Sequence, residues 1–268
     1  MSGMRIATWT VNSVLARLPR LVEWLEQAAP DVVCLQETKV AQGAFPADEV
    51  TALGYEVAQN GEGRWNGVAI LSKAGLADVA PGLPGDPGWP DAGTLEARTI
   101  AATCGPVRLR SVYVPNGRTP DDPHYQYKLH WLAALREAVA ADAAGSVPFA
   151  VMGDYNVAPT DADVWDPAAF VDSTHVTPAE RAALTELLAL GFTDVPPRAL
   201  KGQPFTYWDY RAGMFHKGMG MRIDLVLASA PVAAAVKDAY IDREARKGKG
   251  PSDHAPVVVD LDLVLPAG

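Results

Sequence analysis

The stretch 148-PFAVMGDYN-156 decides the fold class and points to the chemistry. An apolar run of strand length passes directly into Asp154 and Asn156. Successive side chains of a strand point to opposite faces, so these two residues are expected on the same side. The first predicted strand has the same arrangement, with Thr10 and Asn12 two residues apart. Both stretches therefore predict buried strands that end in polar side chains.

Other short apolar runs alternate with helical patterns along the chain. Strands are expected at 5–11, 31–36, 67–72, 98–104, 107–114, 148–154, 221–229 and 254–263. Helices are expected at 17–29, 125–141 and 178–190; the first repeats Leu18, Leu21, Val22 and Leu25 at helical spacing. The alternation predicts an α/β fold with many strands.

Length and composition favour one globular domain over residues 1–268. The 268 residues are 49% apolar and 21% charged, which is enough to bury a large core without disulfides. A Pro- and Gly-rich segment at 81–93 interrupts the pattern. Strand patterns flank it closely and no change of composition follows, so we interpret it as a surface loop rather than a linker.

The charge balance excludes a broadly basic nucleic-acid binder. There are 23 Lys and Arg against 32 Asp and Glu, a net charge of −9, so any phosphate-binding surface must be local. Cys34 and Cys104 lie in or beside apolar runs and do not form the paired framework of a secreted scaffold. The N-terminus lacks a signal peptide pattern and no apolar run reaches membrane-spanning length, so we expect a cytoplasmic protein without membrane contact.

Polar residues gather at the ends of the predicted strands. Glu37 and Asn116 come shortly after apolar runs, Asp253 and His254 precede the last one, and Asp224 lies inside another. Each alone also fits an ordinary strand end, turn or cap. A charge inside an apolar run is rarely buried without a partner, so we expect one for Asp224.

If these ends meet at one rim of the sheets, they form a cluster of carboxylates, amides and one imidazole. Carboxylates so close repel each other unless a cation neutralises them, and dense oxygen ligands suit Mg²⁺ or Mn²⁺. Such an ion polarises a phosphoryl oxygen while another carboxylate activates water. The cluster therefore predicts phosphodiester hydrolysis.

Eight motifs occur in a characteristic order between residues 4 and 263: ATWTVNS, LQETK, GVAI, YVPNGR, GDYNVAPTD, TYWDYR, MRIDLVLAS and PSDHAPV. Together they resemble the exonuclease III / apurinic-apyrimidinic (AP) endonuclease family of the endonuclease, exonuclease, phosphatase superfamily. GDxN and SDHxP are shared across the superfamily, whereas QETK, YxPNG, the DYR segment and RIDxxLAS are typical of the DNA-repair branch. The resemblance implies a four-layer α/β sandwich, two packed mixed β-sheets flanked by helices, with the active site at one edge.

The resemblance also implies roles for the metal-binding and water-activating residues. Glu37 is expected to bind the metal, with help from Asn12 and with Asp253 nearby. Asp154 corresponds to the residue that activates the attacking water. Asn156 is expected to orient that water or to hold a phosphate oxygen.

Further residues are expected to contact the phosphate. By the resemblance, His254 contacts the scissile group, and Asp224 fixes its tautomer and orientation. Tyr113 and Asn116 are expected to donate hydrogen bonds to phosphate oxygens where charge builds. The other four histidines receive no role: His124, His130, His175 and His216.

An apolar pocket for a flipped-out abasic deoxyribose is expected at Tyr207, Trp208, Met221 and Ile223. A tight pocket rejects intact nucleotides by their size, although ordinary core aromatics are the alternative interpretation. Met221 stands where some relatives carry a bulkier aromatic, which implies a looser pocket.

A basic run precedes the PSDH motif and predicts a local clamp for the DNA backbone. It contains Arg243, Arg246, Lys247 and Lys249, and Lys39, Arg64 and Arg118 extend the prediction. A solvated loop is the alternative.

Thr10 departs from the family pattern, which has Asn at this place. A hydroxyl supplies one donor but cannot span the same gap as an amide. Lost transition-state bonds here could cost about 2 to 4 kcal/mol, or about 10²- to 10³-fold in rate. Three explanations for threonine at this position are open: a tolerated natural variant, a paralogue with altered activity, or an introduced substitution.

The leading interpretation is a monomeric, Mg²⁺-dependent hydrolase that acts on double-stranded DNA. It is expected to cut 5′ to abasic sites and to trim blocked 3′ ends, with 3′ to 5′ exonuclease activity. The alternatives are a phosphatase acting on a small phosphorylated molecule and a DNA-damage-binding module with a disabled centre.

Overall fold

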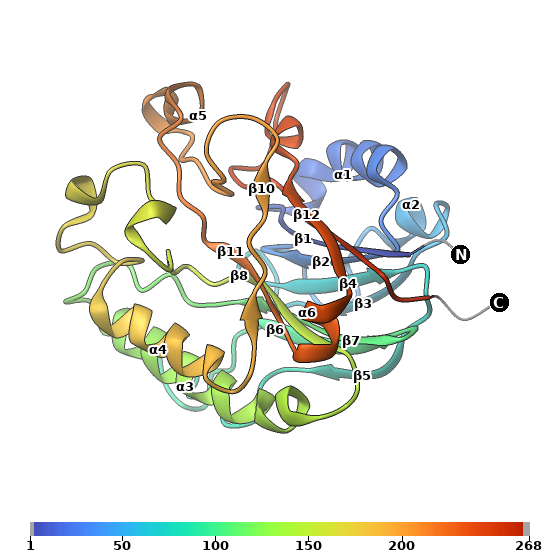
Figure 1. Ribbon diagram of the computed structural model, residues 1–268, viewed down its shortest axis with the longest axis horizontal. Coiled ribbons are helices and arrows are strands. Elements are labelled where there is room, and N and C mark those ends of the chain that lie inside the picture. The colour runs from blue at the N-terminus through green and yellow to red at the C-terminus, as the bar shows by residue number, and fades with distance from the viewer. Residues whose placement is uncertain (1–2, 265–268) are drawn as a thin grey trace.

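The computed structural model describes residues 3–264 and contains two β-sheets packed face to face (Figure 1). The seven-stranded sheet has the order β10-β12-β13-β1-β2-β4-β3, and the six-stranded sheet the order β5-β6-β7-β8-β11-β9. The first sheet consists of β1 (Met4–Thr10), β2 (Val32–Gln36), β3 (Glu56–Asn60), β4 (Val68–Ser72), β10 (Arg198–Ala199), β12 (Val236–Ile241) and β13 (Val257–Leu261). The second consists of β5 (Ala77–Pro81), β6 (Thr99–Cys104), β7 (Val107–Tyr113), β8 (Phe149–Asp154), β9 (Thr193–Asp194) and β11 (Asp224–Ala228).

Helices cover the outer face of each sheet and complete the four layers (Figure 1). The helices are α1 (Val14–Ala28), α2 (Ala47–Thr51), α3 (Pro123–Ala144), α4 (Pro178–Leu188), α5 (Met214–Lys217) and α6 (Ala230–Ala235). Apolar residues of α1 pack on β1, β2 and β4, whereas α3 and α4 pack on β7, β8 and β11. A third apolar cluster fills the space between the sheets. The predicted sandwich of two flanked mixed sheets is confirmed, because each sheet contains both parallel and antiparallel pairs.

The central strands lie where their apolar runs predict them, and the differences concern edges and ends. Helix α1 begins at Val14, because the Ser13 side chain accepts a hydrogen bond from the Ala16 N–H and caps the first turn. Strands β3, β5, β9, β10 and β12 were not predicted, since each is short or interrupted by polar residues and lies at or next to a sheet edge, where most of its residues are not fully buried.

The segment 81–93 is a loop that belongs to the second sheet and its helices. Leu83 packs in the apolar cluster of α3 and α4, and Asp86 accepts a hydrogen bond from the Trp131 indole. Cys34 and Cys104 are buried free thiols. Within residues 3–264, no helix combines the length and the apolar character that crossing a membrane requires.

Candidate active site

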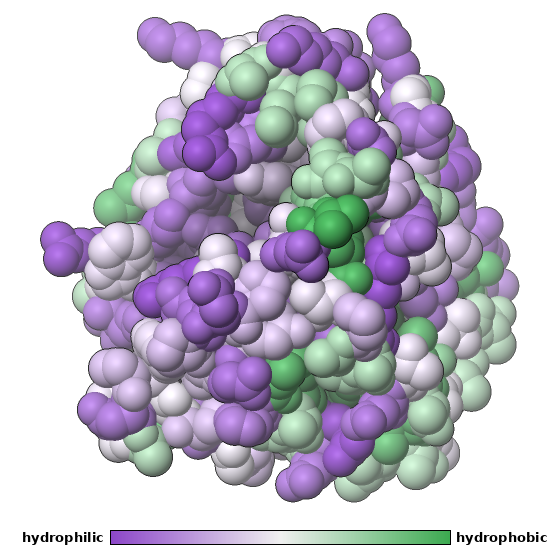
Figure 2. All heavy atoms as spheres, turned by 90° about the vertical axis from the view of Figure 1, so that its left-hand side faces the viewer, coloured by the Kyte–Doolittle hydropathy of each residue, from purple (hydrophilic) through white to green (hydrophobic). Residues whose placement is uncertain are grey.

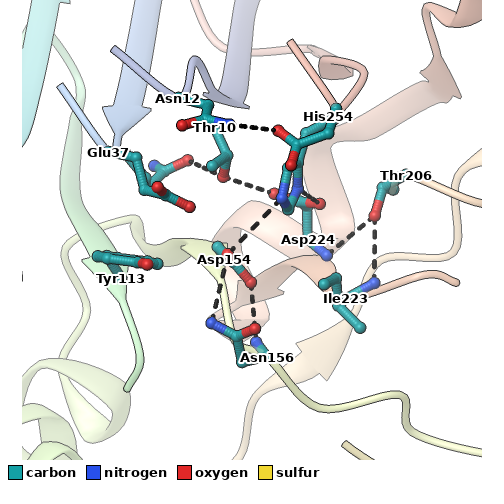
Figure 3. A network of polar contacts seen from close by, with 12 residues as sticks. Thr10, Asn12, Glu37, Tyr113, Asp154, Asn156, Thr206, Ile223, Asp224 and His254 are labelled. Atoms are coloured by element: carbon teal, nitrogen blue, oxygen red, sulfur yellow. Dashed lines mark hydrogen bonds and ion pairs between the residues drawn. The ribbon is translucent and has the colours of Figure 1, made fainter. Parts of the chain in front are cut away.

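The strand register brings the predicted polar ends to one edge of the sandwich. Parallel β7 and β8 pair Tyr113 with Asp154, and antiparallel β8 and β11 pair Asp154 with Asp224. In the other sheet, β1 and β2 run parallel, so that Thr10 and Glu37 emerge at the same edge. Figure 3 shows these side chains, from both sheets, directed toward one another.

Glu37, Asp154 and His254 form the core of this cluster. One potential ligand atom from each lies within 4.8 Å of the others. The Asp154 and His254 side chains are almost fully buried, whereas Glu37 retains partial exposure. Two carboxylates so close together provide oxygen donors for a divalent cation.

His254 is oriented by Asp224 in the centre of the cluster. Its Nδ1 lies 2.7 Å from Asp224 Oδ2, and its Nε2 lies 4.0 Å from Asp154 Oδ2. Burial alone would lower the pKa of His254, but the Asp224 ion pair and hydrogen bond outweigh it and raise that pKa to about 10. The ring is therefore an imidazolium at neutral pH, held with Nε2 toward Asp154.

Asp154 is held by Asn156, whose backbone N–H donates to Asp154 Oδ1 at 2.9 Å and whose Nδ2 lies 3.4 Å from Oδ2. The sequence pattern predicted that strand alternation places Asp154 and Asn156 on the same side. That reason is wrong, because Asn156 has a left-handed backbone with φ 50° and lies beyond the end of the strand. The same holds for Asn12, at φ 50°. Both strands have ended, and each amide reaches the site from a sharp turn.

Burial raises the pKa of Asp154 well above its ordinary value, and the charges of Asp224 and Glu37 raise it further against the opposing effect of His254. Burial also raises the pKa of Tyr113, and Glu37 adds to the shift. Tyr113 therefore keeps its phenolic proton at neutral pH. The cluster holds more negative charge than its own cations neutralise.

Thr10 supplies the single donor expected of a hydroxyl. Its Oγ1 donates to Asp224 Oδ1 at 2.9 Å and lies 3.3 Å from Gln36 Oε1. Gln36 also accepts from Thr8 at 3.1 Å and donates to Ser111 at 2.9 Å. Thr8, Thr10, Gln36 and Ser111 thus form a buried polar layer, which contacts Asp224 through Thr10 (Figure 3).

Asn12, Lys39 and Asp253 form the outer rim of the cluster. Asn12 Nδ2 donates to Asp253 Oδ1 at 3.2 Å, while its Oδ1 accepts from Lys39 Nζ at 2.5 Å. Lys39 also pairs with Glu37 at 2.9 Å. The predicted phosphate-binding lysine is therefore engaged by the predicted metal ligands in this structure.

A cavity of about 400 Å³ opens beside the cluster. Asn116, Arg118, Tyr207 and Met221 are among the residues that line it, and the Tyr207 ring lies 4.9 Å from that of His254. Figure 2 shows the face of the molecule on this side, where mostly hydrophilic residues surround a small hydrophobic patch. An aromatic wall next to a charged centre suits a nucleotide sugar and its phosphate.

The predicted pocket needs two corrections. Trp208 is 1% exposed and packs edge-on against Phe215, because the chain turns it away from the cavity that Tyr207 lines. Ile223 packs behind Met221 in a small apolar cluster instead of lining the cavity. Trp165 and Phe170, which were not predicted, contribute the remaining large apolar wall.

Two of the four cations of the basic run at 243–249 have structural contacts, whereas Lys247 and Lys249 are exposed, so for these two the backbone clamp stays a prediction. Arg243 donates to Phe215 O and Arg246 to Trp208 O, so both hold the chain around α5. Lys247 pairs with Glu244 at 2.6 Å. Of the two isolated arginines, Arg118 lies at the cavity and Arg64 stacks on the exposed Trp65 ring.

Several supporting residues escaped sequence reasoning. Thr206 Oγ1 accepts from the backbone N–H groups of Ile223 and Asp224 at 3.1 Å each. His175 lines the cavity, with Nδ1 2.6 Å from Asn156 O. Thr206 begins the TYWDYR motif, whereas no motif marks His175.

Comparison with known proteins agrees with this arrangement. The model of the endonuclease/exonuclease/phosphatase family matches residues 7–254. The chain is 30% identical to exodeoxyribonuclease III of Haemophilus influenzae over 95% of this chain and 98% of that protein. It is 40% identical to the Neisseria 3′ phosphatase NExo, solved with a product DNA hairpin, with a TM-score of 0.91 and coverage of 97% and 100%.

An AP endonuclease structure from Archaeoglobus fulgidus is 36% identical, with a TM-score of 0.89 over 97% of this chain and 100% of that one. These relatives share the whole fold. Matches of this length, together with the converging strand ends, establish the family. The chain belongs to the endonuclease/exonuclease/phosphatase family and is a hydrolase of its exonuclease III and AP endonuclease branch.

Proposed function

We propose that the protein is a Mg²⁺-dependent DNA-repair enzyme that cleaves 5′ to abasic sites and removes blocking groups from 3′ ends. The observation that carries this proposal is the convergence of Glu37, Asp154 and His254 within 4.8 Å beside an aromatic-lined cavity. Names among the relatives, a 3′ phosphatase and an AP endonuclease, support the two activities.

The donor set fits a hard divalent cation, because carboxylate oxygens predominate and because burial, together with the charges of Asp224 and Glu37, destabilises the Asp154 anion. Glu37 would hold the ion, with Asn12 and Asp253 completing the rim. When bound, Mg²⁺ or Mn²⁺ polarises a phosphoryl oxygen and offsets the charge that develops on it.

The side chains of this protein then have distinct roles. Asp154 accepts the proton of the attacking water, since a buried carboxylate with a raised pKa is a stronger base than an exposed one. Asn156 fixes that carboxylate through its N–H. His254, kept charged by Asp224, stabilises the phosphate, and Tyr113 and Asn116 donate to its oxygens.

Recognition of the lesion is assigned to the cavity. Tyr207 and Met221 receive the base-free sugar or the 3′-terminal nucleotide, and Arg118 and Lys39 contact flanking phosphates. Lys39 would exchange its present contacts with Glu37 and Asn12 for a phosphate.

A duplex with a tetrahydrofuran abasic analogue and a duplex with a 3′-phosphate test the proposal, each with Mg²⁺, Mn²⁺ or EDTA. We expect nicking of the first and phosphate release from the second with metal but not with EDTA. Binding without cleavage would indicate a damage-binding module. Neither binding nor cleavage, with hydrolysis of p-nitrophenyl phosphate, would indicate a small-molecule phosphatase.

A further inference from the structure

Lys128 of α3 is a fully buried lysine that contacts the backbone of two active-site loops. Its Nζ donates to Asn156 O at 2.6 Å and lies 3.2 Å from Asn116 O. It also pairs with Glu180 of α4, and both side chains are 0% exposed. A buried ammonium is costly, so such a group is retained only where several partners satisfy it.

Glu180 binds the segment that faces the cavity from the other side. Its Oε1 accepts from the Thr174 hydroxyl at 2.6 Å and the His175 N–H at 3.0 Å, and its Oε2 accepts from the Thr177 N–H at 3.1 Å. The ion pair thus joins α3 and α4 to three separate loops, those of Asn116, Asn156 and His175.

The two carbonyl groups that Lys128 contacts belong to residues whose side chains face the centre. Asn116 Nδ2 donates to Asn156 Oδ1 at 3.3 Å, and Asn156 donates its backbone N–H to Asp154. Asn156 has a left-handed backbone at φ 50°, which asparagine adopts more readily than most residues. The Lys128 ammonium contacts its carbonyl oxygen and thereby restrains the orientation of this peptide group.

Close packing of the Asn116 loop on the lysine stem strengthens the argument. Gly117 has φ 89°, and a Cβ there would lie 3.0 Å from Lys128 Cδ and 2.8 Å from Thr174 Oγ1. Only glycine allows the loop to approach Lys128 this closely. The loop is therefore fitted to the buried pair as well as hydrogen-bonded to it.

We propose that the Lys128–Glu180 pair is a positioning device for the reaction, an inference that rests on the proposed function. Lys128 fixes the peptide groups of Asn116 and Asn156, and thereby the hydrogen bond that orients Asp154. Glu180 holds the ammonium in place and ties the His175 segment to it. Neither residue touches the substrate.

Two single variants separate positioning from stability. Lys128→Met and Glu180→Gln both break the ion pair, but only Lys128→Met removes the donors to the two carbonyls. We expect both to lower Tm. We expect Lys128→Met to have a kcat about 10- to 100-fold below that of Glu180→Gln, with KM for DNA within about threefold, because small misplacements of reacting groups are costly.

The double variant Lys128→Met/Glu180→Gln sharpens the test, since it leaves neither charge alone. We expect its Tm to recover above that of either single variant while its kcat stays as low as that of Lys128→Met. Leu25→Ala, which leaves a cavity in the apolar cluster beneath α1, is the control, with lower Tm and unchanged kcat. A kcat that follows Tm across the folded variants would overturn the proposal.

Crystal structures of the two single variants keep this inference separate from the proposed function. If the wild-type protein cleaves none of the DNA substrates, the proposed function is wrong. The positioning role then predicts that the Asn156 N–H leaves Asp154 Oδ1 in Lys128→Met but not in Glu180→Gln. Identical loops in both variants would contradict it.

Discussion

The two ends of β1 carry charged clusters of opposite character. At its beginning, Arg5 pairs with Asp260 at 2.7 Å, and its N–H donates to Asp31 at 2.7 Å. Both side chains of that pair are about one third exposed, at 35% and 31%. At the other end, Asp154 and Asp224 are each 1% exposed, and within residues 3–264 the cation that pairs with them is His254.

The difference shows which cluster is built for chemistry. Charges at the beginning of β1 are neutralised by their own partners and by water, so the arrangement costs little and stabilises little. Charges at the far end are buried in excess of their counter-charges, which destabilises the protein unless a cation binds. A cluster whose buried charges exceed their counter-charges therefore identifies the active site better than a simple count of charged residues does.

The largest expected effect comes from Asp154→Asn, which keeps the shape but cannot accept the water proton. We expect the rate of abasic-site nicking to fall by about 10⁴-fold, with DNA affinity nearly unchanged. Asp260→Asn is the matched control at the other end of β1; it should lower stability by at most about 1 kcal/mol and leave the rate unchanged. Substantial nicking by Asp154→Asn would show that another residue accepts the proton of the attacking water.

His254→Asn should have the next largest effect, because it removes the only imidazolium described at the centre. A loss of about 10²- to 10³-fold in kcat is typical when one charge-stabilising donor is deleted. Single-turnover cleavage at saturating protein measures it. If kcat is retained and only KM rises, His254 binds DNA without acting on the transition state.

Glu37→Gln tests whether the excess charge serves a metal. We expect the Mg²⁺ concentration for half-maximal activity to rise about tenfold or more, since the variant removes one anionic ligand. Thermal unfolding gives a readout independent of activity, because ligand binding to the folded state raises Tm. Mg²⁺ should raise the Tm of the wild type more than that of Glu37→Gln. Equal increases in Tm would show that Glu37 does not bind the metal.

The catalytic end was predictable because its signals are local. Glu37 and Asp154 lie at the ends of apolar strands that belong to the parallel pairs β1–β2 and β7–β8, so these ends lie at the same edge. Asp224 begins β11, which runs antiparallel to β8 and so places it beside Asp154. Lys128 and Glu180 were not predictable as a pair, since Glu180 reads as a capping residue of α4 and Lys128 as one polar position of a helix. Their contact depends on how α3 and α4 pack.

The pocket shows the same limit on a smaller scale. Tyr207 and Trp208 are neighbours in an extended segment, where Tyr207 forms bridges with Met221 and His254. Alternation requires that they face opposite ways. The sequence does not show which of them faces the cavity, because that depends on the tertiary position of the segment. Strands β3, β5 and β12, at or next to the sheet edges, likewise depend on neighbouring strands rather than on their own sequence pattern.

Thr10→Asn should have the smallest effect. It tests whether the Thr10 hydroxyl supports Asp224 as well as the asparagine of the family pattern would. The hydroxyl already donates to Asp224 at 2.9 Å, so the missing amide costs less than the sequence alone suggests. An amide offers a second donor and an acceptor toward the centre. We expect an increase in kcat of up to about tenfold, or about 1.4 kcal/mol, in nicking assays across Mg²⁺ concentrations. Equal turnover by the two proteins would show that threonine fully replaces asparagine here.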